Sequence, residues 1–212
     1  MNARPSFRAQ VLQAREDAIV DTVNRLLADK GFDAMTVDLV AAEVSIAKAS
    51  LYKHFASKEQ LAAAAMVRVL ERALAFMGSP ACSGDALTRL KAVARWTMEV
   101  QLAGQMPALP AHNSTLRSAL MADKVYMDRL LQLSEQLGEW IGEAQQQGQL
   151  HPGLPGEVVL YTLFARACDP VLGVLKAGGS YSDAQIIEWL LTSCFEGLGA
   201  PADAKARRRA GS

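Results

Sequence analysis

The sequence has no excess of charge of either sign. Its 212 residues include 22 lysines and arginines and 22 aspartates and glutamates, so the formal net charge is zero. A protein that coats nucleic acid without selectivity carries a large positive charge, and this balance excludes that class. The basic residues are grouped instead, because residues 1–15 and 45–58 each contain three of them and no acidic residue.

Cysteine is scarce, and Cys82, Cys168 and Cys194 are widely spaced. They form no CxxC pair and have no neighbouring pair of histidines, which excludes a disulfide framework and the common zinc motifs. The simplest interpretation is that they are small apolar residues. The alternative is a redox-sensing role for Cys168 or Cys194.

Catalytic motifs are missing as well. His54, His112 and His151 are too far apart to have metal-ligand spacing, and no nucleophile elbow is present. The pair Gly178-Gly179 is too short for a phosphate-binding loop. We therefore expect no enzymatic activity, no metal and no cofactor.

Long apolar segments are also lacking. The N-terminus has no apolar signal core, and the longest apolar run, residues 158–165, stops at Arg166. That run is far short of the ~20 residues needed to cross a bilayer. We expect a cytoplasmic protein without a membrane partner.

Helical periodicity is what the sequence does contain, and strand patterns are lacking. Thr36 and Ser57 are well placed as helix N-caps, and Gly31 as a helix end. Pro170 lies inside an expected helix and should kink it. The prediction is an all-α fold of about nine helices, at residues 8–30, 36–43, a short one through 55 whose first residue is left open, 58–77, 85–103, 113–121, one carrying 126–144, 155–177 and 183–198.

Residues 36–58 have the pattern of two short helices joined by a tight turn. An apolar stripe with spacing i, i+3 and i+4 begins at Val37, and Leu51 and Phe55 form a second stripe. Ile46 lies in the turn and is expected to pack back between the helices. A helix-turn-helix unit requires such a contact.

The remaining sides of the second short helix are polar, basic and slim. Lysine neutralises phosphate, serine and tyrosine hydroxyls donate to phosphate oxygens, and small residues such as Ala47 and Ala49 let a helix enter the major groove. A polar face that only contacts water is the alternative. The polar residues in question are Lys48, Ser50, Tyr52, Lys53 and His54.

A longer pattern surrounds these residues: Gly31-Phe32, Thr36-Val37, Ala41-Ala42, Ile46, Lys48, Ser50-Leu51-Tyr52, His54-Phe55 and Lys58-Glu59-Gln60-Leu61. With this spacing the region resembles the DNA-binding domain of the TetR family of bacterial transcriptional regulators. Two positions depart from the family pattern, since Ser45 replaces the usual turn glycine and Ala47 the usual serine N-cap. Ser45 is therefore expected in a strained or altered turn. The missing cap costs the helix about 1 kcal/mol unless Ser45 caps it one turn earlier.

The resemblance implies an organisation for the whole chain. It implies a three-helix DNA-binding head at residues 1–57 and a helical body at residues 58–200 that binds an effector and dimerises. The helix at 58–77 belongs to both cores and can transmit a tilt between them. A tail at 201–212 is expected to be disordered. Repression by promoter occlusion is the family's usual mode.

The expected DNA target is a partly palindromic operator bound by two recognition helices. Lys48 and Ser50 are the predicted base-edge contacts, while Arg4 and Arg8 are expected to reach a neighbouring groove from a disordered arm. The predicted phosphate contacts are Thr36, Tyr52, His54 and Lys58, and Lys53 completes the DNA-binding surface.

The last two expected helices are apolar on more than one side. Helices of that kind must be buried, and the family pairs its last two helices into a four-helix interface with two-fold symmetry. A thick core within one chain is the alternative. The predicted homodimer residues are Leu172, Ile187, Leu191 and Phe195, with Trp189 and Leu198 extending the stripe.

We place the effector cavity between the helices at 85–103, 126–144 and 155–177. A mainly apolar or aromatic small molecule is the expected ligand. Each apolar residue could instead be ordinary core. The predicted lining residues are Trp96, Val100, Leu137, Trp140, Phe164 and Cys168, with Glu99, Asn113, Gln136 or Arg166 as polar anchors.

A second function class stays open. Because Ser45 and Ala47 depart from the family pattern, the chain could be an all-helical dimeric ligand carrier or interaction protein whose head has lost DNA binding. A DNA-binding assay on variants of the basic face separates the two classes.

Overall fold

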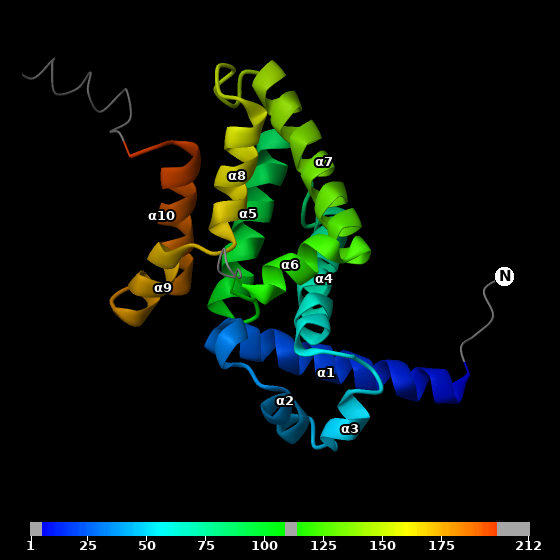
Figure 1. Cartoon of the computed structure of the whole chain (residues 1–212). Coiled ribbons are helices and arrows are strands. Elements are labelled where there is room, and N and C mark those ends of the chain that lie inside the picture. Colours follow the sequence, from blue (N-terminus) through cyan, green and yellow to red (C-terminus); the bar gives the residue numbers. More distant parts are fainter. Residues whose placement is uncertain (1–5, 109–113, 199–212) are drawn as a thin grey trace, which may run out of the picture.

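The computed structural model describes residues 6–108 and 114–198, so Arg4, Asn113 and the tail 201–212 lie outside the described residues. The described residues form ten helices and no strand, which confirms the all-α prediction. In Figure 1, α2 and α3 lie on one side of α1 and the body helices lie on the other. The helices are α1 (Phe7–Ala34), α2 (Val37–Glu43), α3 (Lys48–Leu51), α4 (Lys58–Met77), α5 (Ala86–Leu102), α6 (Thr115–Ala122), α7 (Lys124–Gln146), α8 (Gly156–Arg166), α9 (Pro170–Ala177) and α10 (Asp183–Phe195).

Local capping sets the start of most of these helices. The Thr36 hydroxyl accepts from the Leu39 N–H at 3.1 Å, and the Ser57 hydroxyl accepts from the Gln60 N–H at 3.1 Å. Each satisfies one of the amide donors that a helix leaves unpaired in its first turn. Both predicted N-caps are thus confirmed.

The first helix differs from its prediction at both ends. The Ser6 hydroxyl caps α1 by accepting from the Ala9 N–H at 3.2 Å, so Arg8 lies in a regular helix and not in a disordered arm. Gly31 has a φ of 72°, a left-handed conformation that glycine adopts without steric cost, and it interrupts α1 as expected. One further helical turn follows it.

The structure has two helices, α8 and α9, where the sequence predicts one at 155–177, and this is why ten helices are found instead of nine. Residues 167–169 are not helical, and Pro170 is the first residue of α9 instead of a kink inside a longer helix. Asp169 caps α9, because its carboxylate accepts from the Val171 N–H at 3.0 Å. Proline is well tolerated at a first helical position, where its missing N–H would have no helical partner.

Two cores meet along α4. Leu61 and Met66 pack in the core of the head, whereas Ala73 and Met77 pack in the core of the body. Leu116 of α6 is also buried in the head core, which therefore extends beyond the first three helices. Burying one such leucine contributes about 2 kcal/mol. A movement of α4 or α6 must consequently disturb the packing of the head.

The predicted dimer residues are mostly in the core of their own chain, which corrects the assignment. Leu172, Ile187 and Leu191 are buried, and Phe195 is half-buried with the Lys91 ammonium 5.6 Å from its ring centre. These side chains face α5 because the stripe they form supplies the body core. The exposed large apolar side chains of α8, α9 and α10 are Val158, Tyr161, Val171, Val174 and Trp189.

Candidate DNA-binding surface and ligand pocket

The turn between α2 and α3 holds the two helices in a helix-turn-helix arrangement. Ser45 adopts a φ of 54°, so the strained turn expected for this residue is present. Its N–H donates to the Ala42 carbonyl at 3.2 Å, and the Ile46 N–H donates to the Ala41 carbonyl at 3.0 Å. Ile46 packs against the head core, as predicted for the turn residue.

The recognition helix α3 begins at Lys48 without a side-chain cap. Ala47 is its N-cap residue and offers no oxygen, and Ser45 does not replace it. Backbone bonds close the first turn instead, because the Ala47 carbonyl accepts from the Ser50 N–H at 2.8 Å. The helix therefore forms despite both departures from the family pattern.

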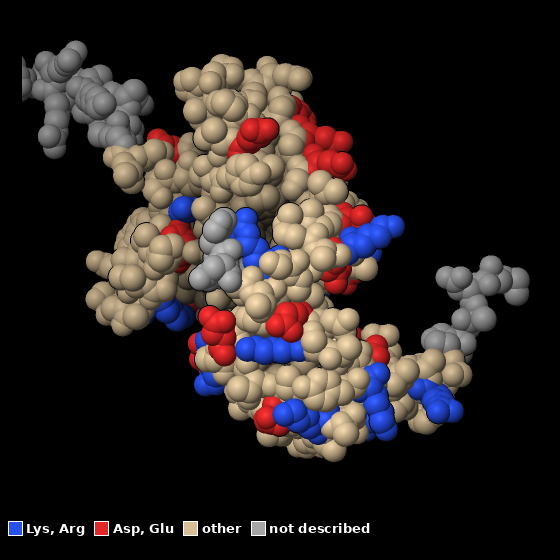
Figure 2. Space-filling model, in the orientation of Figure 1, with Lys and Arg blue, Asp and Glu red and all other residues tan. Residues whose placement is uncertain are grey.

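Five of the seven predicted DNA contacts are exposed or half-buried on the surface of α2, α3 and their flanking residues. Lys48 and Lys53 are exposed, and Tyr52 exposes 45% of its surface. Ser50 is half-buried, while Thr36 is exposed and retains a hydroxyl proton beyond its capping bond. Figure 2 shows several basic side chains over this end of the molecule.

The other two predicted contacts, His54 and Lys58, are turned toward α1. The His54 side chain is only 9% exposed, and its Nδ1 lies 3.0 Å from the Glu16 carboxylate. The Lys58 ammonium lies 4.2 Å from the Phe32 ring centre and donates to the Asp33 carbonyl at 3.3 Å. In this arrangement both side chains stabilise the packing of the head against α1.

An acidic residue that the sequence reasoning missed lies beside the DNA-binding surface. The Asp38 carboxylate in the first turn of α2 accepts from the Lys48 ammonium at 2.9 Å. This hydrogen bond is the largest cause of a raised pKa for Lys48. Only the turn geometry brings the two residues together, since they are ten positions apart.

The effector cavity predicted between α5, α7 and α8 is filled with side chains, which corrects that assignment. Val100, Leu137 and Trp140 are buried core residues. Trp96 stacks on Phe76 with ring centres 5.5 Å apart. Phe164 packs partly buried against the same core.

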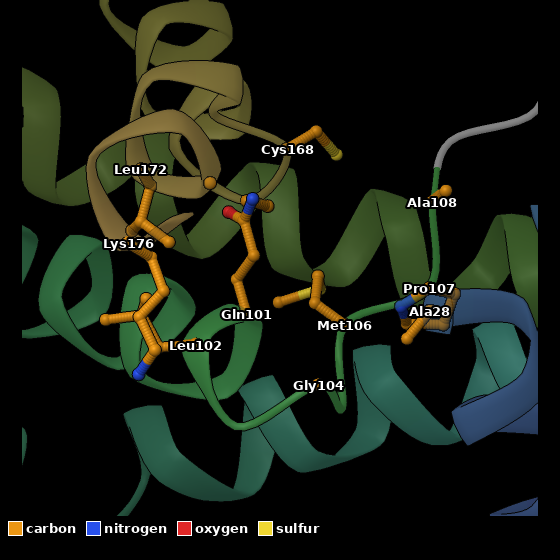
Figure 3. Close-up of a pocket in the computed structure, with 12 residues that line it drawn as sticks. Ala28, Gln101, Leu102, Gly104, Met106, Pro107, Ala108, Cys168, Leu172 and Lys176 are labelled. Carbon is orange, nitrogen blue, oxygen red and sulfur yellow. The ribbon is translucent and has the colours of Figure 1, made fainter. Parts of the chain in front are cut away.

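A cavity of about 450 Å³ lies nearby, where α5 ends and α8 gives way to α9. Figure 3 shows side chains from these segments, from the α5–α6 loop and from α1 around it. Cys168 is the one predicted lining residue that it contains. Its lining includes Gln101, Leu102, Met106, Cys168, Leu172 and Lys176, with Ala28 contributed by α1.

Polar contacts set the shape of this pocket. The Gln101 side chain donates to the Asp169 carbonyl at 3.1 Å and accepts from the Asp169 N–H at 3.3 Å. The Asp169 carboxylate is 2% exposed and forms an ion pair with Arg166 at 2.5 Å. These hydrogen bonds hold the segment between α8 and α9 against α5.

The pocket wall is also attached to the head. The Asn24 side chain of α1 is buried and donates to the Gln105 carbonyl at 2.7 Å. Arg72 of α4 donates to the Gln105 side chain at 2.9 Å. The α5–α6 loop therefore contacts the pocket and two helices of the head core.

The thiols differ in their surroundings. Burial raises the pKa of the Cys82 and Cys194 thiols. Because the thiolate is the reactive form, this lowers their reactivity toward oxidants. A redox-sensing role for Cys194 has little support, and Cys168 is accounted for as a pocket residue.

Comparison with known proteins identifies the head. Residues 19–65 match the sequence model of bacterial regulatory proteins of the tetR family. The head of the chain therefore has the sequence of a TetR-family DNA-binding domain. The TetR-type match includes α2, α3 and the turn between them.

A curated relative shares this head. It is the negative transcriptional regulator IcaR of the icaADBC biofilm operon of Staphylococcus aureus strain Newman, 46% identical over 46 residues. The match covers 22% of this chain and 25% of IcaR, so the chain spans about a quarter of the length of this relative.

Solved structures share the whole fold at low identity. FadR from Bacillus subtilis in complex with stearoyl-CoA has a TM-score of 0.63 and 17% identity, covering 86% of this chain and 99% of that one. AibR in complex with isovaleryl coenzyme A and operator DNA has a TM-score of 0.58 and 21% identity, covering 85% and 98%. At this identity the likeness establishes the fold alone.

Proposed function

We propose that this chain is a ligand-responsive transcriptional repressor of the TetR family that binds a palindromic operator as a homodimer. The observation that carries the proposal is the exposed α2–α3 surface, where Lys48, Tyr52 and Lys53 are accessible beside a formed turn. These side chains supply the charge and the hydroxyl group that phosphate and base edges require. Repression is the proposed mode because IcaR, which shares the head, is a negative regulator.

The proposed homodimer interface is the outer side of α8–α10. A soluble monomer rarely exposes a large apolar patch, and these helices expose Tyr161, Val174 and Trp189. Gly156–Ala177 is apolar and long enough, by composition, to cross a membrane. It is divided into helices of 11 and 8 residues, however, and a span needs ~20 in one helix. The division favours a protein interface and a cytoplasmic location.

The proposed effector is a small molecule with a mostly apolar part. The acyl thioesters of coenzyme A, which join an apolar acyl chain to a polar phosphorylated carrier, are the first class to test. Two regulators of the same fold are solved with stearoyl-CoA and isovaleryl coenzyme A. The cavity of about 450 Å³ combines apolar side chains with the Gln101 amide and the Lys176 ammonium. An apolar site with a few polar groups is typical of small-molecule pockets.

Regulation is proposed to run through the pocket wall. A ligand that moves the α5–α6 loop also moves Gln105, which is bonded to Asn24 of α1 and Arg72 of α4. DNA affinity then falls only to the extent that the ligand prefers the conformation in which the two recognition helices are not spaced to fit the operator. A preference of about 1 to 3 kcal/mol weakens binding roughly 5- to 150-fold.

The ligand-carrier alternative rests on Ser45 and Ala47. Neither residue prevents α3 from forming, so they do not support a head that has lost DNA binding.

The test is selection of genomic fragments by the purified chain, followed by affinity measurement with the double variant Tyr52→Ala/Lys53→Ala. We expect a loss of at least tenfold, because a hydroxyl donor and a phosphate-neutralising charge are removed. The control is Lys30→Ala, which removes an exposed lysine of α1 outside α2–α3 and away from the proposed interface. Unchanged affinity of the first variant would contradict DNA binding by this surface.

A further inference from the structure

The ion pair between Asp38 and Lys48 occupies the surface proposed to contact DNA. The Lys48 ammonium and the Asp38 carboxylate are 2.9 Å apart, and their side chains are 48% and 72% exposed. Asp38 is the second residue of α2 and Lys48 the first of α3, so the pair bridges the two helices beside their turn. It is a side-chain contact at the start of a helix that has no side-chain cap.

Such an exposed pair does little for folding. Exposed ion pairs contribute between zero and about 1 kcal/mol, and the backbone bonds of the turn already hold α3. A negative charge close to a phosphate backbone is also unfavourable for DNA binding in general. The first turn of α2 favours a carboxylate at Asp38, but that does not require the carboxylate to bond Lys48, so the bond needs a reason of its own.

The chemistry of lysine supplies that reason. A lysine side chain is flexible, and its ammonium has three N–H donors. The bond to Asp38 fixes where the ammonium lies and leaves two donors for acceptors on a base edge. Without Asp38, the ammonium is free to turn to the nearest phosphate, which carries no sequence information.

We propose that Asp38 is a specificity-determining residue that acts through Lys48. It holds the Lys48 ammonium toward the base edges and away from the phosphates, so that random DNA loses more affinity than the operator does. The inference rests on the proposed function, since it concerns the same α2–α3 surface.

The test is the variant Asp38→Asn, which keeps the size of the side chain and removes its charge. Affinity is measured over a salt series for the operator recovered with the unmodified chain and for random DNA of equal length. We expect affinity for random DNA to rise at least threefold and operator affinity to change less than threefold. The slope of log K against log salt on random DNA should steepen by about 0.9, because one more phosphate is contacted. A purely structural role would leave this slope unchanged.

Three further variants make the outcome decisive. Asp38→Glu keeps the charge and should retain the original ratio of operator to random affinity. In a Lys48→Ala background, Asp38→Asn should have no further effect on that ratio. Asp29→Asn is the matched control, because Asp29 is also an exposed acid 3.3 Å from a lysine but lies in α1, near the α5–α6 loop. It should leave the ratio unchanged.

Equal effects of Asp38→Asn and Asp29→Asn, or an unchanged ratio for Asp38→Asn, would overturn the role of Asp38 while leaving DNA binding intact. If the unmodified chain selects no DNA, the proposed function fails and this inference fails with it. The failure of the proposed function is thus seen with the unmodified chain, and the failure of the Asp38 role is seen only with the variants.

Discussion

His54 illustrates how a single residue can change role between sequence and structure. Its motif predicts a phosphate contact, yet the ring is largely buried and its Nδ1 lies 3.0 Å from the Glu16 carboxylate of α1. The partner lies 38 positions away, so no local pattern indicates the pairing. Lys58 is a second example, because its ammonium lies over the Phe32 ring of α1 although the motif predicts a phosphate contact. Motif reasoning located the surface, but it could not assign which of its side chains face outward.

A prediction follows for His54→Ala. We expect the free energy of unfolding to fall by about 1 to 2 kcal/mol, because a largely buried hydrogen-bonded ring is removed. The salt dependence of DNA binding should not change. Thermal melting and a salt series of binding measurements check both statements.

The matched comparison is Lys53→Ala, which removes an exposed charge from the same segment. It should leave the melting temperature nearly unchanged and lower the salt slope by about 0.9. A lower slope for His54→Ala would instead restore the phosphate role of the histidine.

At the scale of helices, local signals were sufficient where a cap lies next to its helix. Thr36 and Ser57 were found for that reason. The division between α8 and α9 was missed, although Asp169 followed by Pro170 is a helix-start signal. The apolar stripe of α10 is visible in the sequence, but periodicity does not indicate whether the stripe packs on its own chain or on a second one.

The α8–α9 division supplies a test at this scale. In Asp169→Ala the cap of α9 is lost and Arg166 keeps a largely buried charge without its carboxylate partner. Breaking such a pair costs about 3 kcal/mol or more, which corresponds to a fall in melting temperature of roughly 6 to 12 °C. Calorimetry measures the change.

Glu188→Ala is the control, because it breaks the exposed pair between Arg95 and Glu188. Exposed pairs contribute at most about 1 kcal/mol, so only a small change is expected. Equal effects of the two variants would mean that the Asp169 pair does not stabilise the division.

For the whole molecule, the architecture could be predicted and the assembly surface could not. The order of helices and the shared α4 follow from periodicity and from the family resemblance. The sequence predicts a contact with a second chain for Leu172, Ile187 and Leu191, because apolar periodicity does not distinguish burial within a chain from burial between chains. The exposed side chains of α8–α10 now define the expected interface.

The dimer prediction is therefore made with Tyr161→Glu/Val174→Glu. Both side chains are exposed, at 67% and 70%, so the variant should fold normally as a monomer. Light scattering at micromolar concentration should give the mass of one chain for the variant and two for the unmodified protein. Operator affinity should fall as well, since one recognition helix then binds alone.

Leu131→Glu on α7 is the control, because it places the same charge on an exposed leucine of another helix. It should remain dimeric. A monomeric unmodified chain would refute the proposed interface.

The attachment of Gln105 to Asn24 has a mechanical consequence for the pair of chains. A head joined to its body through α4 alone is free to twist about that helix and to bend in any direction. The Gln105 tether lies at a distance from the α4 axis and opposes the twist, and the burial of Leu116 of α6 in the head core opposes bending on that side. In the proposed dimer the two heads can then separate in few ways, so a ligand has few motions to bias.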